Sequence, residues 1–346
     1  MDLEALYYRV RDTISSLDIR RIWPGFEPLK FALYDDKTCF FDGRYIEKTN
    51  DFCANTSIVY GGEQIAIWMV QEELEIPVLT SKIVHEMFHG CQRIMGWDCW
   101  PNELEALYRY EYDAENLALK IRENELLLSL LDRPCDTALL ELLSHRKRRS
   151  IRFPYEFSYE TKVEEIEGTA NYVEWQVLKQ LDENKANELT EQMRGLLANP
   201  EYLFPIRISS YFTGALMIHA LRGAGRYCFD TAERPAFLSE LKDVDPSDGD
   251  FPGAADVIRH AADAVAVFNE ETDSIIRAAL EKDQVVLNGP LELTGVNVYN
   301  ARCRNGFITS TYFLMYREDN ADKMLFGNFV IKMQDEKTIA TVYRWE

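Results

Sequence analysis

The sequence predicts an α+β fold with a mainly helical body, a small mixed sheet near the N-terminus and an antiparallel β unit at the C-terminus. Short runs of β-branched and aromatic residues, separated by turn-forming pairs, occur before residue 71 and after residue 284. Between them, apolar residues recur every three or four positions, as in amphipathic helices. At 346 residues and 47% hydrophobic content, the chain can bury a large core. We therefore expect three parts, residues 1–76, 77–283 and 284–346, with a helical hairpin at 102–150 inserted into the second.

The N-terminal part begins with a helix and continues into short strands. Apolar side chains have helical spacing in residues 1–16, and Trp23-Pro24-Gly25 then predicts a turn. Turn-forming pairs at Asp35-Asp36, Asp42-Gly43 and Gly61-Gly62 separate three expected strands, which lie at residues 30–34, 57–60 and 64–70. We expect this small sheet to lie directly before the next helix.

The central part should be helical throughout. Pro77 and Thr80-Ser81 are typical of a helix start, and Gly96 is typical of a helix end. A long helix is expected from Asn102 to about residue 131, where Pro134 breaks the pattern. Further helices are expected at residues 136–149, 155–181, 186–198, 208–222 and 254–281.

The C-terminal part has strand-like runs separated by the turn-forming pairs Gly289-Pro290, Asn305-Gly306 and Asp319-Asn320. Strands are expected at residues 285–287, 291–299, 307–316, 325–332 and 339–343.

Composition narrows the class of protein. A net charge of −20 argues against nucleic acid or an anionic membrane as partners, because phosphate binding needs a basic surface. The N-terminus is acidic and lacks the apolar run of a signal peptide, and no apolar stretch reaches membrane-spanning length. Seven cysteines without a CxxC pair indicate reduced thiols. We expect a cytoplasmic protein, and its oligomeric state stays open.

One basic run, Arg146-Lys147-Arg148-Arg149, interrupts the acidic background. We expect it to be a solvated helix end, where cations complement the helix dipole; a docking patch for an acidic segment is the alternative.

The motif that organises the sequence is His85-Glu86-Met87-Phe88-His89, which matches HExxH. Residues four apart lie on one face of a helix, so both imidazoles can bind one metal ion, with Glu86 beside an open coordination position. The alternative is two core histidines with a surface-facing glutamate. A catalytic zinc needs a third protein ligand, so the motif alone is incomplete.

The third ligand is expected from residues 164–174, which contain Glu167-Gly168-Thr169-Ala170-Asn171-Tyr172. This segment resembles the EGxAxY segment of gluzincin metallopeptidases, and especially the NEGFA-type segment of the large zinc aminopeptidases. The resemblance implies a zincin-like fold, one Zn²⁺ per chain and Glu167 as the third ligand. A carboxylate on a helix can meet the two imidazoles, and Gly168 allows two helix backbones to approach closely. Glu164 is the alternative ligand.

Glu167 belongs to a stripe of carboxylates at three- and four-residue spacing, completed by Glu160, Glu164 and Glu174. Carboxylates on one helix face repel one another unless a positive group lies among them, which a metal or nearby arginines would provide. A solvent-exposed acidic face is the alternative for most of the stripe.

A second segment, Tyr211-Phe212-Thr213-Gly214-Ala215, is similar to the Tyr-x-x-Gly-Ala/Phe segment of the same aminopeptidases. There the tyrosine hydroxyl hydrogen-bonds the oxyanion of the tetrahedral intermediate, so the resemblance implies this role for Tyr211. His219 is the reserve donor. The aminopeptidase segment GxMEN, which binds a free amino terminus, has no clear counterpart before the HExxH helix. The resemblance therefore implies hydrolysis but not exopeptidase specificity.

The expected activity is zinc-dependent hydrolysis of a peptide bond in a peptide or protein substrate. Zinc bound by His85, His89 and Glu167 would activate water, Glu86 would act as general base, and Tyr211 would stabilise the oxyanion. The alternatives are an inactive zinc-binding or protein-interaction module on the same scaffold, and a helical interaction protein in which HExxH is accidental.

Overall fold

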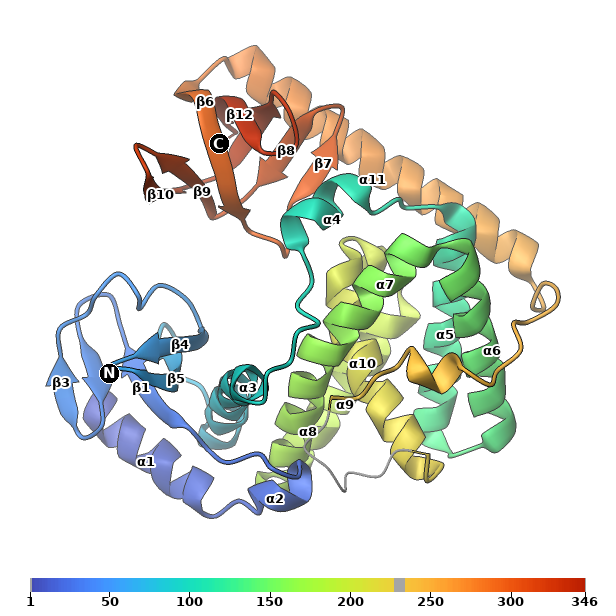
Figure 1. Ribbon diagram of the computed structural model, residues 1–346, viewed down its shortest axis with the longest axis horizontal. Helices are drawn as coiled ribbons and strands as arrows, with labels where there is room; N and C mark the ends of the chain where they lie inside the picture. The colour runs from blue at the N-terminus through green and yellow to red at the C-terminus, as the bar shows by residue number, and fades with distance from the viewer. Residues whose placement is uncertain (1, 227–233, 346) are drawn as a thin grey trace.

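The computed structural model describes residues 2–226 and 234–345 and has the predicted α+β composition (Figure 1). A mixed sheet near the N-terminus and an antiparallel sheet at the C-terminus flank a helical body, which confirms the coarse fold prediction. Among the described residues, every helix is too short or too polar to span a membrane.

The N-terminal sheet has five strands in the order β3-β2-β1-β5-β4, and β1 and β5 are parallel whereas the other pairs are antiparallel. Phe31 and Leu33 face the core that contains α1 and α3, whereas Ala32 and Tyr34 pack with Phe52 on the opposite face. The bounds are α1 Leu3–Ser15, α2 Ile19–Ile22, β1 Lys30–Tyr34, β2 Cys39–Phe41, β3 Arg44–Ile46, β4 Thr56–Tyr60 and β5 Glu63–Met69.

Strands β2 and β3 were not predicted, although the turn between them was. Each has only three residues, which is too short to show an alternating pattern. Asp42 in the turn has φ of 50°, in the left-handed region that tight hairpins require.

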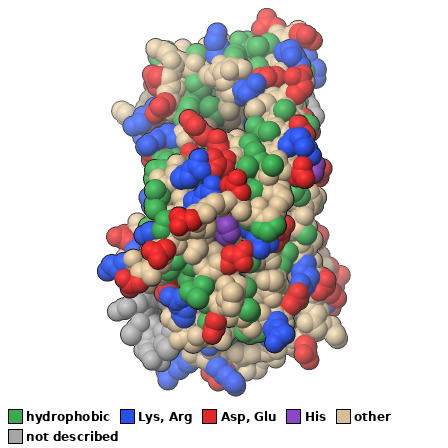
Figure 2. Space-filling model, turned by 90° about the vertical axis from the view of Figure 1, so that its right-hand side faces the viewer, with side chains coloured by type: hydrophobic (Ala, Val, Ile, Leu, Met, Phe, Trp, Pro, Cys, Tyr) green, Lys and Arg blue, Asp and Glu red, His purple; other side chains and the backbone are tan. Residues whose placement is uncertain are grey.

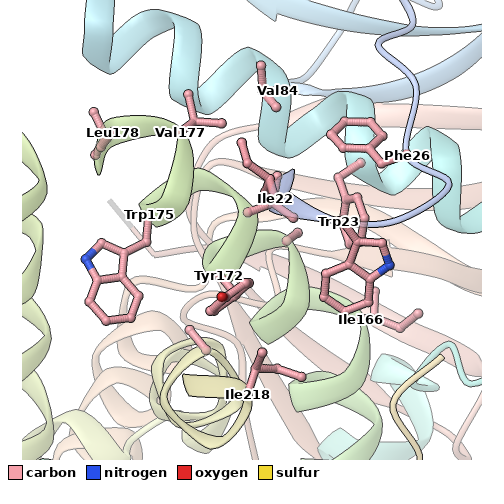
Figure 3. Packing of buried hydrophobic residues seen from close by; sticks show 14 of the residues in the cluster. Ile22, Trp23, Phe26, Val84, Ile166, Tyr172, Trp175, Val177, Leu178 and Ile218 are labelled. Carbon is pink, nitrogen blue, oxygen red and sulfur yellow. The ribbon is translucent and has the colours of Figure 1, made fainter. Parts of the chain in front are cut away.

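The central body is helical, and its core joins α3 to α8 and α10. Figure 3 shows Tyr172 of α8 between Trp23 and Trp175, with Val84 of α3 on one side of it and Ile218 of α10 on the other. The bounds are α3 Ile76–Ile94, α4 Glu103–Arg109, α5 Ala114–Asp132, α6 Asp136–Arg152, α7 Pro154–Val163, η1 Glu164–Gly168, α8 Thr169–Leu181, α9 Glu183–Ala198, η2 Pro200–Leu203, α10 Ile206–Gly223, η3 Ser239–Leu241 and α11 Ala254–Lys282.

The predicted continuous helix after Asn102 is wrong, because the chain breaks between α4 and α5. The Asp113 side chain accepts hydrogen bonds from the backbone N–H groups of Glu115 and Asn116 and so starts α5 afresh. The hydroxyl of Tyr110, at the end of α4, donates to Glu160 at 2.7 Å. The break therefore directs Tyr110 into the interior.

The prediction of a solvated basic run is also wrong, because Arg146 and Arg149 are buried. Arg146 NH2 lies 2.5 Å from Glu164 Oε2, and Arg149 NH1 lies 2.9 Å from Glu123 Oε2. These ion pairs compensate the cost of burying the charges.

On the side where α6 lies in Figure 1, acidic and basic side chains are interspersed over the surface (Figure 2).

The C-terminal sheet has seven strands in the order β10-β9-β6-β12-β11-β8-β7, all antiparallel, and it packs beside α11 through Ile276, Ala279 and Val330. The predicted strand at 307–316 divides into β8 and β9, because Tyr312 has φ of 73° and turns the chain. The bounds are β6 Val285–Val296, β7 Arg302–Arg304, β8 Phe307–Ser310, β9 Phe313–Glu318, β10 Ala321–Phe326, β11 Phe329–Met333 and β12 Thr338–Arg344.

Candidate metal centre

His85, His89 and Glu167 form a cluster that could hold a metal ion, with one donor atom from each residue within 4.8 Å of the others. His89 Nε2 lies 3.1 Å from His85 Nε2 and 3.1 Å from Glu167 Oε2. His85 Nε2 lies 3.8 Å from the same Glu167 oxygen. The three residues selected from the sequence therefore meet in space.

These separations fit one ion. Zinc binds imidazole nitrogen and carboxylate oxygen at about 2.0–2.2 Å, so tetrahedral ligands lie roughly 3.3–3.5 Å apart. The three observed separations bracket that value. The donor set of two imidazoles and one carboxylate leaves one coordination position for a water or a substrate.

Glu164, the alternative ligand, does not reach the cluster. Its carboxylate accepts hydrogen bonds from Arg146, from Lys120 Nζ at 3.3 Å and from Thr213 Oγ1 at 2.6 Å. The turn at Glu164–Gly168 is a π turn, which widens the angle between residues three apart compared with an α-helix. Glu164 consequently points into the helical core, whereas Glu167 faces the two histidines.

Gln92 fixes the orientation and the tautomer of His89. The Gln92 Nε2 atom donates to the carbonyl of Ile166 at 2.8 Å and to the hydroxyl of Thr169 at 2.9 Å. Its Oε1 atom therefore lies toward His89 Nδ1, 2.9 Å away, and accepts a hydrogen bond from the Nδ1–H group. This leaves His89 Nε2 unprotonated and free to bind a metal.

Glu174 lies beside His85 as an ion-pair partner. Its Oε2 atom lies 3.2 Å from His85 Nδ1, and its Oε1 atom lies 3.3 Å from Lys82 Nζ. Burial opposes ionisation of Glu174, but His85 and Lys82 lower its pKa to about 2. The ionised carboxylate is therefore the counter-charge beside Nδ1, which makes no hydrogen bond among the described residues, and Nε2 is the His85 nitrogen that faces the cluster. Glu174 is thus not part of an exposed acidic face.

The remaining pKa shifts keep Glu167 ionised and bring Glu86 closer to neutral pH, whereas His85 holds a proton that a metal would have to displace. Burial opposes charge on Glu167, but His89, His85 and Arg207 hold its pKa well below the usual value. Burial also disfavours the charged form of His85, yet contacts with Glu167 and Glu174 raise its pKa to about 10. Burial raises the pKa of Glu86, against the opposing effect of the two imidazoles.

The cluster opens into a cleft of about 300 Å³. Glu86 and Tyr211 both line it, as do Thr56 and Ser57 of the edge strand β4. The full lining consists of Asn55, Thr56, Ser57, His85, Glu86, His89, Arg93, Trp100, Pro101, Glu103, Glu167, Arg207, Tyr211 and Tyr299.

Tyr211 is connected to the cluster through Arg207. The Arg207 NH2 group lies 2.8 Å from Glu167 Oε1 and 3.1 Å from the Tyr211 hydroxyl. The Tyr299 hydroxyl, from the loop after β6, lies 3.1 Å from the Tyr211 hydroxyl. Burial raises the pKa of Tyr211 well above its usual value, so the hydroxyl keeps its proton at neutral pH.

His219, the reserve donor, lies elsewhere. It lines a separate cavity with Tyr172 and Lys179, and burial lowers its pKa to about 4 with help from Lys179 and Arg222. Arg207 and Tyr299 were not predicted from the sequence, and Gln92 had no predicted role in the site. Tyr299 had no signal near the motif, whereas Gln92 follows His89 by three positions on the same helix and could have been found as an orienting partner.

A scan against protein-family models matched none, and searches of curated proteins and of solved structures also returned no match.

Proposed function

We propose that the protein is a zinc metallopeptidase with a gluzincin-like site on a zincin-like scaffold. The observation that carries this proposal is the position of three donor atoms, from His85, His89 and Glu167, at the mutual spacing of tetrahedral zinc ligands and beside Glu86. Two imidazoles and one carboxylate favour zinc over magnesium or calcium, which prefer oxygen ligands. When bound, the ion would lower the pKa of water to about 7 and polarise a carbonyl group.

Glu86 is the general base in this proposal. Its carboxylate lies in the cleft, next in sequence to His85 and on the same helix, and accepts the proton of the attacking water. The raised pKa of Glu86 brings it closer to neutral pH, where a carboxylate can both take a proton and return it to the leaving amine.

Tyr211 supplies the hydrogen-bond donor for the oxyanion. The phenol oxygen accepts a hydrogen bond from Arg207 and lies 3.1 Å from the Tyr299 hydroxyl, so two partners orient the Tyr211 hydroxyl before the substrate binds. Because Tyr211 stays protonated at neutral pH, it can donate when negative charge develops on the carbonyl oxygen.

An extended peptide is the substrate that suits the cleft. Strand β4 is at the edge of the N-terminal sheet and pairs with β5 along one side only. Thr56 and Ser57 at its start line the cleft. The free backbone N–H and C=O groups of an edge strand can bind a peptide as an additional strand.

The metal content of purified protein tests the proposal. We expect about one zinc per chain by mass spectrometry, strongly reduced in Glu167→Ala because one of three ligands is lost. His219→Gln is the matched control and should keep the metal, since His219 lies outside the cleft. Wild-type protein that binds no zinc after reconstitution would contradict the proposal and favour a binding module.

The role of Glu86 has its own test. Glu86→Gln should keep zinc, because Glu86 is not a ligand, but should lower turnover of a peptide substrate by roughly 10²–10⁴-fold. Peptide cleavage and zinc content are measured on the same preparation. Turnover at the wild-type rate would show that another group is the base.

A further inference from the structure

We infer that Arg93 forms a carboxylate-binding subsite at one end of the cleft, so that preferred ligands carry an acidic side chain or a free C-terminal carboxylate at a fixed distance from the metal. The inference rests on the proposed zinc peptidase function and adds a substrate class to it. Three observations carry it: the position of Arg93 on α3, its ion-pairing state and its contact with Trp100.

Arg93 lies on the same face of α3 as Glu86. The two residues are seven positions apart, which is two helical turns, and both line the cleft. Two turns correspond to roughly 10 Å along the helix axis. The Arg93 guanidinium stacks on Trp100, whose ring centroid lies 6.2 Å from that of His89, so it is close to the metal site. A peptide bound at Glu86 would therefore reach Arg93 within about three extended residues.

The charge of Arg93 is available to a ligand. Two arginines line the cleft, and Arg207 is already held by Glu103 and Glu167. Arg93 is exposed, and its guanidinium forms no ion pair with any residue in the described part of the chain. A carboxylate that enters the cleft can therefore bind Arg93 without displacing an internal partner.

Trp100 positions the guanidinium for this contact. The Arg93 Cζ atom lies 4.0 Å from the centroid of the Trp100 ring. The ring is itself held by a hydrogen bond of 2.8 Å from its Nε1 atom to the carbonyl of Trp97. Stacking on an aromatic face leaves the N–H edge of a guanidinium free for a bidentate carboxylate. Arg93 thus has the geometry of an anion receptor.

Charge reversal and a matched pair of ligands test the inference. Two peptide hydroxamates, which bind zinc directly, are titrated calorimetrically into zinc-loaded protein; they differ only in a C-terminal carboxylate or carboxamide. We expect the carboxylate to bind wild type about 10- to 100-fold more tightly, as for a charge-assisted hydrogen bond. The preference should vanish in Arg93→Met and reverse in Arg93→Glu. A third hydroxamate, with an aspartate residue and an amidated C-terminus, identifies the source of the preferred carboxylate. Tight binding of this ligand indicates an acidic side chain, and weak binding indicates a free C-terminus.

The controls separate the two ways of failing. Arg9→Met removes an exposed arginine of α1 outside the cleft lining and should leave the preference unchanged. If wild type binds both hydroxamates equally, or if Arg93→Met keeps the preference, the carboxylate subsite is overturned while the zinc site stands. If the carboxamide hydroxamate does not bind wild type at all, the proposed zinc function fails, and the subsite fails with it.

Discussion

At the scale of single residues, the centre is determined as much by the partners of the histidines as by the histidines themselves. His89 is hydrogen-bonded to the neutral amide of Gln92, whereas His85 is ion-paired with the charged carboxylate of Glu174, and we expect this charge to orient it. Both partners occupy the ring nitrogen that faces away from the cluster. The two Nε2 atoms are thereby presented together, which an HExxH spacing alone does not guarantee.

Replacing Glu174 tests this orienting role. Glu174→Gln keeps the side-chain volume but removes the negative charge beside His85, so we expect zinc affinity to fall by about 10- to 100-fold while the fold persists. Affinity is measured by competition with a chromophoric chelator. Glu183 is an exposed residue of α9, and Glu183→Gln removes the same single negative charge. This control variant should leave zinc affinity unchanged. Equal affinity in Glu174→Gln and Glu183→Gln would remove the orienting role.

At the scale of elements, the helix formed by α7, η1 and α8 directs glutamate side chains toward helices on two different sides. Its π turn directs Glu164 toward α5 and α6 and Glu167 toward α3. It can approach α10 closely because Gly168 meets Gly214 there. A Cβ atom added at Gly168 would lie 2.5 Å from the Cα of Gly214. The backbone contact between these helices sets the distance from Glu167 to Arg207 and Tyr211.

Gly168→Ala should therefore damage both stability and the site. The added methyl group meets backbone rather than a flexible side chain, so α10 must shift, at a cost of roughly 1–3 kcal/mol. Chemical denaturation measures the stability and chelator competition the zinc affinity. Gly195→Ala in α9 is the control, because no heavy atom within 4 Å opposes its Cβ, and it should stabilise by about 0.5–1 kcal/mol. Equal stability of the two variants would refute the close contact.

The buried ion network behind the site predicts a response to acid. Burial opposes charge on Glu164, but Arg146 and Lys120 lower its pKa to about 2, compared with 4.5 for an unperturbed glutamate. A depressed pKa contributes stability that is present above pH 4.5 and lost as the pH falls toward 2. Wild-type protein should lose stability over that interval.

Glu164→Gln tests the assignment of this acid response. The substitution removes the negative charge that pairs with the buried cations Arg146 and Lys120. It should lower the free energy of unfolding by about 3–5 kcal/mol at pH 7. It should also flatten the dependence of the unfolding free energy on pH below 4.5, because one depressed carboxyl is gone. Urea unfolding at several pH values measures both effects. An unchanged pH dependence would show that other carboxyl groups cause the acid response.

At the scale of the whole molecule, the parts that sequence predicted were those with local patterns. Helical spacing predicted His85 and His89 on one face, and a motif resemblance selected Glu167. Arg146 and Arg149 were misplaced because a run of cations usually indicates solvent, and only the three-dimensional packing brings Glu123 and Glu164 beside them. Glu174 could not be assigned because its direction depends on the π turn upstream.

The C-terminal sheet shows the same limit most clearly. Alternation and turn residues predict a sheet here but not all of its boundaries, because Gly289-Pro290 lies inside β6 and the predicted strand at 325–332 spans β10 and β11. The role of the sheet in the site has no signal in the sequence. Tyr299 is 88 positions from Tyr211, and no local pattern connects them. The sheet packs along α11, and the loop after β6 places this tyrosine in the cleft. The N-terminal sheet contributes Ser57 to the same cleft, so all three parts of the chain form its walls.

Tyr299→Phe tests whether the C-terminal sheet takes part in the reaction. The substitution removes the hydroxyl that lies 3.1 Å from the Tyr211 hydroxyl but leaves Tyr211 bound to Arg207. We expect kcat for a peptide substrate to fall about 2- to 10-fold, the value of one neutral hydrogen bond, with zinc content and stability unchanged. Tyr211→Phe should lower kcat further, by about 10²–10³-fold, because the oxyanion donor itself is lost.

The control for Tyr299→Phe is Tyr312→Phe, which removes a hydroxyl from an exposed residue in the turn between β8 and β9, 76% accessible and outside the cleft lining. Its kcat should equal that of wild type. If the kcat of Tyr299→Phe also equals that of wild type, the C-terminal sheet lines the cleft without taking part in the reaction. Arg207 alone would then orient Tyr211. If instead the double variant Tyr211→Phe/Tyr299→Phe is no slower than Tyr211→Phe, the two hydroxyls act as one unit, and the sheet acts on the oxyanion through Tyr211.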